Sequence, residues 1–487
     1  MEQATARVGT TTETGLRPGL GLFDSIALVA GSMIGSGIFI VAADIVRQVG
    51  SPAALLATFV VAGLMTIAGA LAYGELAAMM PQAGGQYVYL REAYGSLWAF
   101  LFGWTLLLII QTGTIAAVAV AFARFLGVLW PVLGSRVWLG VGTFGFSGER
   151  VGAIVVIVVL TCANLRGLNL GRLVQNSFTS AKVLALVMIV LVGCVLFPNP
   201  AALRANFGSP HEFFFHDLPP TGFLAVFGTA MVGALFSADA WASVTFAASE
   251  IRNPRSNLPR ALALGSGAVI LLYVLTNLAY LFQLPAAGVA HGADAFARGI
   301  AHAASDRVAS AAMEVVWGAA GASLTAILVM ISAFGCANGL ILTGARVIYA
   351  MAEDGVFFAA ARRLNAANVP AFALIVQGVW AALLAVSGTY SELLDYVIFA
   401  ALFFYVLTVG AVFRLRKTRP DEPRPYRAWG YPIVPAAYMV AAAAMMIDLL
   451  VMNPRFSWPG VIIVLSGVPI YLVTRRRTSV AAVRSRG

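Results

Sequence analysis

Long apolar runs separated by short polar segments make up most of this chain. A helix crosses the hydrocarbon core of a membrane with about 20 apolar residues, and twelve such stretches can be counted. They lie near residues 22–47, 53–79, 97–126, 151–166, 174–197, 222–249, 260–283, 311–350, 371–388, 391–413, 431–452 and 458–474. The pattern therefore predicts an all-α integral membrane protein with twelve transmembrane helices.

Two of these stretches are interrupted midway by small or polar residues. The first contains GSMIGSG at 31–37, and the sixth contains FSADAWAS at 236–243. The first ten stretches form two series of five, one starting near residue 22 and the other near residue 222. The two interruptions each fall in the first stretch of a series, at matching places in two halves. Broken helices at corresponding positions are typical of transporters built from inverted repeats. The layout predicts repeats at about 22–197 and 222–413, followed by two extra helices (11 and 12) at 431–474.

Composition and charge indicate the orientation of this bundle. Hydrophobic residues make up 60% of the chain and charged residues 11%, against about 25% charged residues in soluble domains. With the N-terminus inside, 21 of the 31 Lys and Arg residues lie in cytoplasmic segments and 7 in external ones. Both termini are therefore expected in the cytoplasm, and the protein in the plasma or inner membrane of the cell. The net charge of +10 then reflects orientation and not nucleic-acid binding.

The segments around the transporter core (21–413) are short and basic. They are a cytoplasmic N-terminal tail (1–20), a basic cytoplasmic loop (414–430) and a basic cytoplasmic tail (475–487). The three cysteines show no metal-ligand or disulfide spacing, and the four histidines lie in predicted loops. We therefore expect no metal and no cofactor.

The first interruption suggests a site for a small charged molecule. If the helix unwinds at 33–37, the N–H groups of Ser36 and Gly37 begin the outer half-helix and face an anion, aided by the positive end of the helix dipole. The carbonyls of Met33 and Ile34 then face a cation. The alternative is that the glycines of this stretch form a small-xxx-small motif for close helix packing.

The second interruption supplies matching acceptors, because the carbonyls of Phe236 and Ala238 can face the same cation. An anion site beside a cation site fits a carboxylate and an ammonium on one carbon, which is an α-amino acid. Unwound backbone at membrane depth is tolerated only where it lines such a cavity. The two interruptions together therefore predict an amino acid site.

Several segments carry a family resemblance. GSMIGSGIFI (31–40), YGELAAMMPQAGGQYVYLREAYG (73–95), FSADAWASVTFAASEIRNPRSNLPRAL (236–262) and GCANGLILTGARVIYAMAEDG (335–355) are the segments concerned. Together they resemble the amino acid–polyamine–organocation (APC) superfamily of transporters, in its L-type amino acid transporter (LAT)-like branch. The resemblance extends over roughly residues 20 to 475.

The resemblance implies the LeuT-like 5+5 inverted-repeat fold and assigns roles at matching positions. Ser36 and Gly37 match the break that binds the carboxylate. Met33, Phe236 and Ala238 match positions whose carbonyls receive the α-amino group. The cargo implied is an amino acid held between the two breaks.

Four further side chains acquire roles near the cargo. Phe236 matches an aromatic gate, Tyr273 matches a tyrosine that faces the site, and Tyr405 matches a residue lining the side-chain pocket. Asp239 lies within the second interruption, where two interpretations stay open. It caps the outer half-helix, or it contacts a cationic side chain or the ammonium of the cargo.

Lys182, in the fifth stretch, is an ionisable residue at membrane depth. A lysine there costs roughly 2.5–3.5 kcal/mol on insertion scales. One interpretation is a lysine that snorkels to the cytoplasmic interface. The other places its ammonium against the first interruption and the eighth stretch, where sodium-coupled relatives hold an ion. The resemblance then implies sodium-independent transport, with a proton-coupled role for Lys182 still open.

These patterns predict a secondary-active amino acid transporter that works by alternating access, with sodium-independent exchange as its mode. The alternative is a proton-coupled symporter of amino acids, or of cationic amino acids or polyamines. An intramembrane enzyme is a remote alternative, because the predicted spans contain no histidine base. A channel is also remote, because paired broken helices favour alternating access. The chain contains no phosphate-binding loop, which disfavours an ATP-driven pump.

The resemblance implies a possible partner, because animal members of this branch are linked to a single-span glycoprotein, the heavy chain, through a cysteine between the third and fourth spans. The external loop 127–150 contains no cysteine, so no disulfide-linked heavy chain is expected. The predicted state is a monomer or a non-covalent dimer.

Overall fold

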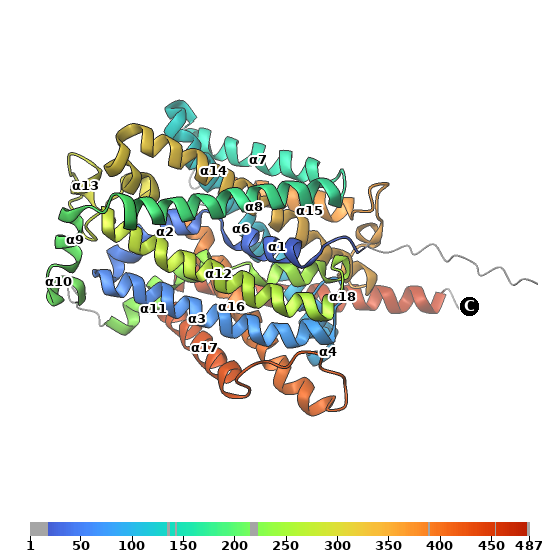
Figure 1. Ribbon diagram of the computed structural model, residues 1–487. Helices are drawn as coiled ribbons and strands as arrows, with labels where there is room; N and C mark the ends of the chain where they lie inside the picture. The colour runs from blue at the N-terminus through green and yellow to red at the C-terminus, as the bar shows by residue number, and fades with distance from the viewer. Residues whose placement is uncertain are drawn as a thin grey trace, which may run out of the picture.

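A computed structural model describes residues 18–133, 137–141, 144–214, 223–387, 390–452 and 454–484. Within this part of the chain, ten helices are long and apolar enough to cross a membrane. They run along a common axis, and α1 (Leu22–Met33) begins at the end of the bundle where α18 (Pro454–Arg484) ends (Figure 1). The remaining two predicted stretches form the shorter helices α7 (Gly148–Asn164) and α15 (Ala371–Ser387). The predicted multi-pass helical architecture is confirmed.

The other helices follow in chain order. In the first half they are α2 (Gly37–Val49), α3 (Pro52–Met79), α4 (Gln86–Tyr94), α5 (Ser96–Thr105), α6 (Gln111–Leu129), α8 (Leu168–Val190), α9 (Pro200–Phe207) and α10 (Pro210–Phe214). In the second half they are α11 (Phe223–Ser237), α12 (Pro254–Gln283), α13 (Ala295–Arg298), α14 (Val308–Glu353), α16 (Tyr390–Thr418) and α17 (Ile433–Met452). Short 3₁₀ helices cover Pro131–Leu133, Trp241–Glu250, Ala304–Asp306 and Ala359–Arg362, and π-helical turns cover Leu106–Ile110 and Leu191–Leu196.

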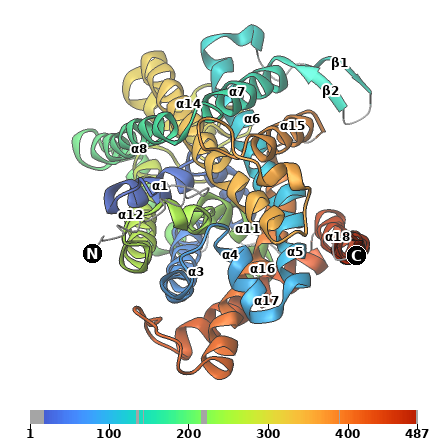
Figure 2. The ribbon, with the colours of Figure 1, turned by 90° about the vertical axis from the view of Figure 1, so that its right-hand side faces the viewer.

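Both interrupted stretches lie in the interior of the bundle. The most apolar windows of Leu22–Val49 and Val226–Glu250 are each 94% buried, against 28% for Ile433–Met452. Viewed from the end, α11 lies near the centre, with α3, α12, α14 and α16 around it (Figure 2). Small residues allow such close packing between membrane helices. The breaks are therefore enclosed by protein, where unwound backbone is tolerated.

Three segments between or after the predicted spans differ from the prediction. The loop 127–150 contains an antiparallel hairpin of β1 (Val137–Val141) and β2 (Phe144–Ser147), which the all-α prediction did not include. Its β-branched and aromatic residues favour paired strands. Helix α16 extends into the predicted basic loop as far as Thr418, and α18 extends into the predicted basic tail as far as Arg484.

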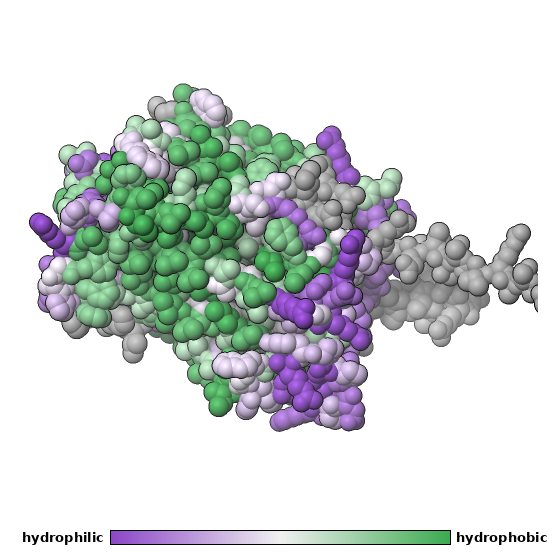
Figure 3. All heavy atoms as spheres, in the orientation of Figure 1, coloured by the Kyte–Doolittle hydropathy of each residue, from purple (hydrophilic) through white to green (hydrophobic). Residues whose placement is uncertain are grey.

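The surface shows the pattern expected of a bundle that crosses a membrane. Hydrophobic residues cover the middle of the face shown in Figure 3, and hydrophilic residues gather at the end where α18 finishes. An apolar belt of this kind matches a lipid environment around the middle of the bundle.

Candidate functional site

The first break consists of residues 34–36, between the end of α1 and the start of α2. Ile34 leaves the helical region, with φ −73° and ψ 86°. The Gly35 N–H donates to the carbonyl of Met33 over 2.8 Å, and the Phe39 N–H donates to the carbonyl of Ser36 over 3.1 Å. Since the regular helical pattern is lost here, carbonyls of this segment accept hydrogen bonds from other helices. The break falls within the stretch 33–37 predicted to unwind.

Lys182 of α8 reaches this break. Its Nζ lies 2.5 Å from the carbonyl oxygen of Gly31, 2.8 Å from that of Ile34 and 3.4 Å from that of Ser332 in α14. The Lys182 side chain is fully buried. Within the described part of the chain, the partners of its ammonium are carbonyl oxygens and include no carboxylate.

Other helices bind the remaining carbonyls of the break. The hydroxyl of Ser332 lies within hydrogen-bond distance of the carbonyl oxygens of Ile34 and Gly35, at 3.2 Å from each. The hydroxyl of Tyr273, in α12, donates to the carbonyl of Met33 over 2.9 Å. The thiol of Cys336, in α14, donates a hydrogen bond to the carbonyl of Ser32 over 3.0 Å. Side chains from α8, α12 and α14 therefore hold the unwound segment in place.

The second break follows the end of α11 at Ser237. Ala240 has φ +65°, a left-handed conformation that is rare for a residue with a side chain. Trp241–Glu250 then continues with 3₁₀ winding that is interrupted by a kink at Ala247 (φ −97°, ψ 20°), so it consists of short pieces, as is usual for this winding. The carbonyl of Phe236 accepts the N–H of Asp239 over 3.2 Å. This stretch is an irregular and tightly wound continuation of the helix.

Asp239 is nearly buried and has a specific partner. The hydroxyl of Tyr405, in α16, donates to its carboxylate over 2.7 Å. The rings of Trp241 and Tyr73 pack around Tyr405, with centroids 5.3 Å and 6.0 Å from its ring. Ala240 occupies the N-cap position of the 3₁₀ segment that follows, and the cap predicted as one role of Asp239 stays a prediction.

The two breaks touch each other at Gly37. An added Cβ on Gly37 would lie 2.8 Å from the Cα of Ser237, which is closer than atoms tolerate. The structure therefore brings the start of α2, with Ser36 and Gly37, against the end of α11, where Phe236 and Ala238 are buried. The predicted backbone residues thus form one cluster.

A small cavity of about 20 Å³ lies beside the second break. Its polar lining comes from Gln86, Gln111, Thr114, Asp239, Ser243 and Tyr405. Of the site residues predicted individually from sequence, Asp239 and Tyr405 line this cavity. It also borders the π-helical turn Leu106–Ile110. The hydroxyl of Thr112 donates a hydrogen bond to the carbonyl of Leu107 in this turn over 2.7 Å.

Sequence reasoning missed part of the site. Ser332 and Cys336 lie in SAFGCANG (332–339), a run of small residues within an apolar helix that resembles the first interruption in composition. That composition was the available signal for a close approach to the break. The π-helical turn at 106–110 has no corresponding signal, since its residues are all Leu or Ile.

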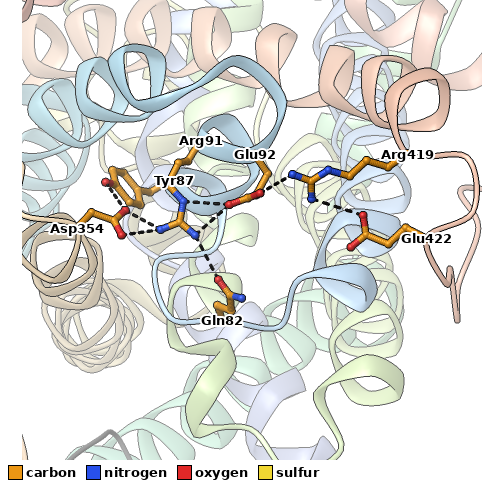
Figure 4. Close-up of polar contacts among 7 residues, drawn as sticks. All are labelled: Gln82, Tyr87, Arg91, Glu92, Asp354, Arg419 and Glu422. Atoms are coloured by element: carbon orange, nitrogen blue, oxygen red, sulfur yellow. Dashed lines mark hydrogen bonds and ion pairs between the residues drawn. The ribbon is translucent and has the colours of Figure 1, made fainter.

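A polar network joins α4 to the residue after α14 and to the loop after α16 (Figure 4). Arg91 pairs with Asp354 at 2.6 Å and with Glu92 at 3.1 Å, and Tyr87 donates to Asp354 over 2.8 Å. Glu92 also pairs with Arg419, from the loop after α16, at 2.6 Å. Partial burial raises the pKa of Glu92, but the hydrogen bonds from Arg419 and Arg91 outweigh it and hold that pKa below its ordinary value.

The fold and these contacts define the class as a multi-pass helical membrane transporter with two broken helices at its centre. The family model described as "Amino acid permease" matches residues 20–473, so the chain belongs to the amino acid permease family of the APC superfamily. The predicted membership is confirmed, and the chain is a transporter and not an enzyme. In the described part of the chain, no group of three or more His, Cys, Asp or Glu residues could hold a metal.

Similar proteins come from bacteria and mammals. The mouse b(0,+)-type amino acid transporter 1 is 27% identical, covering 94% of this chain and 88% of that protein. The serine/threonine exchanger SteT of Bacillus subtilis is also 27% identical, covering 96% and 99%. The human large neutral amino acids transporter small subunit 2 is 28% identical, covering 94% and 80%. These similarities support membership of the LAT-like branch.

Proposed function

We propose that this permease exchanges amino acids across the cell membrane without sodium. The observation that carries the proposal is the Lys182 ammonium on the carbonyls of Gly31 and Ile34. Unwound carbonyls of broken helices coordinate Na⁺ in sodium-coupled transporters. Because the Lys182 ammonium already occupies such carbonyls, Na⁺ would have no binding site there through which to drive transport. The exchange mode is supported by the name of the relative SteT, a serine/threonine exchanger.

The cargo would bind between the two breaks. Its carboxylate would accept hydrogen bonds from the N–H groups of Ser36 and Gly37 at the start of α2. Its ammonium would face the carbonyls of Met33, Phe236 and Ala238. The contact between the breaks at Gly37 supports this arrangement, since both half-sites then lie within reach of one small molecule.

The side chain of the cargo would extend toward the cavity beside Asp239. An Asp239 carboxylate that bonds Tyr405 favours a polar or cationic side chain. The cavity, at about 20 Å³, has room for about one water molecule. Loading an amino acid would therefore require its walls to move apart, and Phe236 would close the outer side after loading.

In this proposal the chain has twelve spans in a LeuT-like 5+5 repeat with two further helices. Both termini lie in the cytoplasm, as the distribution of Lys and Arg indicates. The two repeats would rock against each other around the cargo. The chain would act alone or as a non-covalent dimer, since the loop 127–150 has no cysteine for a disulfide-linked partner.

A proton-coupled symporter is the second candidate. The supporting observation is that carbonyl oxygens, and no carboxylate, hold the Lys182 ammonium in the described part of the chain. An amine held only by neutral groups is able to release and regain a proton during the cycle.

The test is uptake of a panel of labelled amino acids into proteoliposomes. Each is measured with and without internal unlabelled amino acid, with and without sodium, and across a proton gradient. We expect uptake to require internal amino acid and to ignore sodium. Uptake into empty vesicles driven by an inward proton gradient would replace exchange by symport. A requirement for sodium would refute the role proposed for Lys182.

A further inference from the structure

An apolar groove runs between α7 and α15 on the outside of the bundle. Its volume is about 590 Å³. The residues that line it are Ile154, Ile157, Val158, Thr161, Cys162, Leu165, Ile375, Gly378, Val379, Ala382, Leu383 and Val386. Large side chains on its rim are about half exposed, for example Val158 at 52% and Leu383 at 55%. The α7–α15 groove is therefore open to the lipid side.

The floor of the α7–α15 groove is formed where the two helices approach closely. An added Cβ on Gly378 would lie 2.6 Å from the hydroxyl oxygen of Thr161. That hydroxyl donates its proton to the Ile157 carbonyl in its own helix over 2.7 Å, so it has no donor left for a ligand. The groove consequently suits a hydrocarbon chain, because a polar group placed there would lose its hydrogen bonds.

One end of the α7–α15 groove is cationic. Leu165 lines that end, and its carbonyl accepts a hydrogen bond from Asn365 over 2.9 Å. Arg166 and Arg363 flank this contact in the chain, and both are exposed. Neither forms an ion pair with another residue that the structure describes. Arg166 directly follows Leu165 and Arg363 lies two residues before Asn365, so both exposed arginines belong to the segments that meet at this end of the groove.

We propose that the α7–α15 groove binds one anionic phospholipid. An acyl chain would lie in the groove, and the phosphate would contact Arg166 and Arg363. Guanidinium groups pair with phosphate through two parallel hydrogen bonds. A single-span helix from another protein would fill the groove but would not use the two exposed arginines in this way. The arginines favour a headgroup that carries a net negative charge.

The thiol of Cys162 reports directly on the occupancy of the groove. It is exposed and lines the groove, whereas Cys194 is only partly exposed and lies outside it. The full chain in detergent micelles is treated with N-ethylmaleimide while dioleoyl phosphatidylglycerol or dioleoyl phosphatidylcholine is added. Peptide mass spectrometry gives the alkylation rate of each cysteine. Cys194 in the same molecule is the internal reference.

We expect phosphatidylglycerol to protect Cys162 at a concentration at least about fivefold lower than phosphatidylcholine, because one basic residue near a headgroup contributes about that factor. Arg166→Gln with Arg363→Gln should remove the difference between the lipids. The matched control is Arg252→Gln with Arg255→Gln, two exposed arginines before and within the start of α12, on the other side of the bundle from α15 (Figure 2). In this control variant, the two lipids should protect Cys162 at the same concentrations as in the unchanged chain.

Three results would overturn the proposal. One is equal protection by the two lipids, which would mean that bulk lipid covers the groove. Another is a preference for phosphatidylglycerol that survives loss of Arg166 and Arg363. The third is protection that rises with protein concentration in the absence of lipid, which would identify a second copy of the chain as the occupant.

Discussion

At the scale of single residues, Lys182 gives the sharpest test of the proposed coupling. We expect Lys182→Met to lower transport about tenfold or more, because the carbonyl of Gly31 loses its charged donor and an unsatisfied buried group costs about 1–3 kcal/mol. The measurement is exchange in proteoliposomes together with the thermal unfolding temperature. The control is Lys417→Met, which removes the only other lysine of the chain, exposed near the end of α16. Full transport by Lys182→Met would refute the proposed role.

A second residue-scale prediction concerns the buried ion pair of Arg346 and Glu250. Their side chains are 0% and 2% exposed, with Nε and Oε1 2.8 Å apart. Removing one partner of a buried pair leaves an uncompensated charge and costs about 3–5 kcal/mol. We expect Arg346→Met to lower the free energy of unfolding strongly, and Arg346→Met with Glu250→Gln to recover part of the loss. Additive losses in this double-mutant cycle would mean that the two side chains do not interact.

The sequence predicted residues at the site to different degrees. The burial of Lys182 against the first break was one of two interpretations of a lysine in an apolar stretch, and the choice depended on a resemblance. Its third contact, Ser332, lies 150 positions away in the eighth stretch, which only the resemblance had placed against Lys182. Asp239 stood out as a charge in a break, but its bond to Tyr405 depends on how α16 packs against α11. Such pairings follow from tertiary contacts that periodicity does not encode.

At the scale of elements, the sequence predicted where helices lie better than how each is wound. Apolar length located the spans, and the glycines and serines located the first break. The 3₁₀ winding of Trp241–Glu250, the π-helical turn Leu106–Ile110 and the hairpin of β1 and β2 were not predicted. Neighbouring helices can impose such local windings on residues with no matching preference, since tertiary context overrides propensity.

The contact between the two breaks gives an element-scale prediction. Gly37→Ala should weaken both stability and amino acid binding, because overpacking against the Cα of Ser237 costs about 1–3 kcal/mol. Gly37→Leu should abolish binding. Gly267→Ala is the control, since an added Cβ on that α12 residue meets nothing within 4 Å. Thermal unfolding and binding of labelled amino acid are measured for all three. Unchanged binding by Gly37→Leu would mean that the cargo lies elsewhere.

At the scale of the whole molecule, ionic contacts tie the loop after α16 to the rest of the bundle. Glu75, near the C-terminal end of α3, pairs with Arg416 in the last turns of α16 at 2.6 Å and with Arg424 of the loop at 3.4 Å, and also accepts the N–H of Ala428 over 2.7 Å. Glu92 of α4 holds the same loop through Arg419. The basic segment predicted as a topology signal is therefore also bound to the bundle by carboxylates from α3 and α4.

This attachment predicts a dependence of stability on pH. The pKa of Glu92 is lowered from 4.5 by its arginine partners, so the folded chain binds fewer protons than the unfolded chain over that range. The stabilisation by Glu92 is therefore fully present above about pH 4.5 and is lost as the pH falls through the lowered pKa. We expect Glu92→Gln to lower the unfolding temperature near neutral pH and to flatten its decline in acid. Asp421→Asn, an exposed residue of the same loop, should leave both unchanged. Identical acid profiles for Glu92→Gln and the unchanged chain would show that the loop is held by other contacts, and that Glu75 and its arginine partners secure it without Glu92.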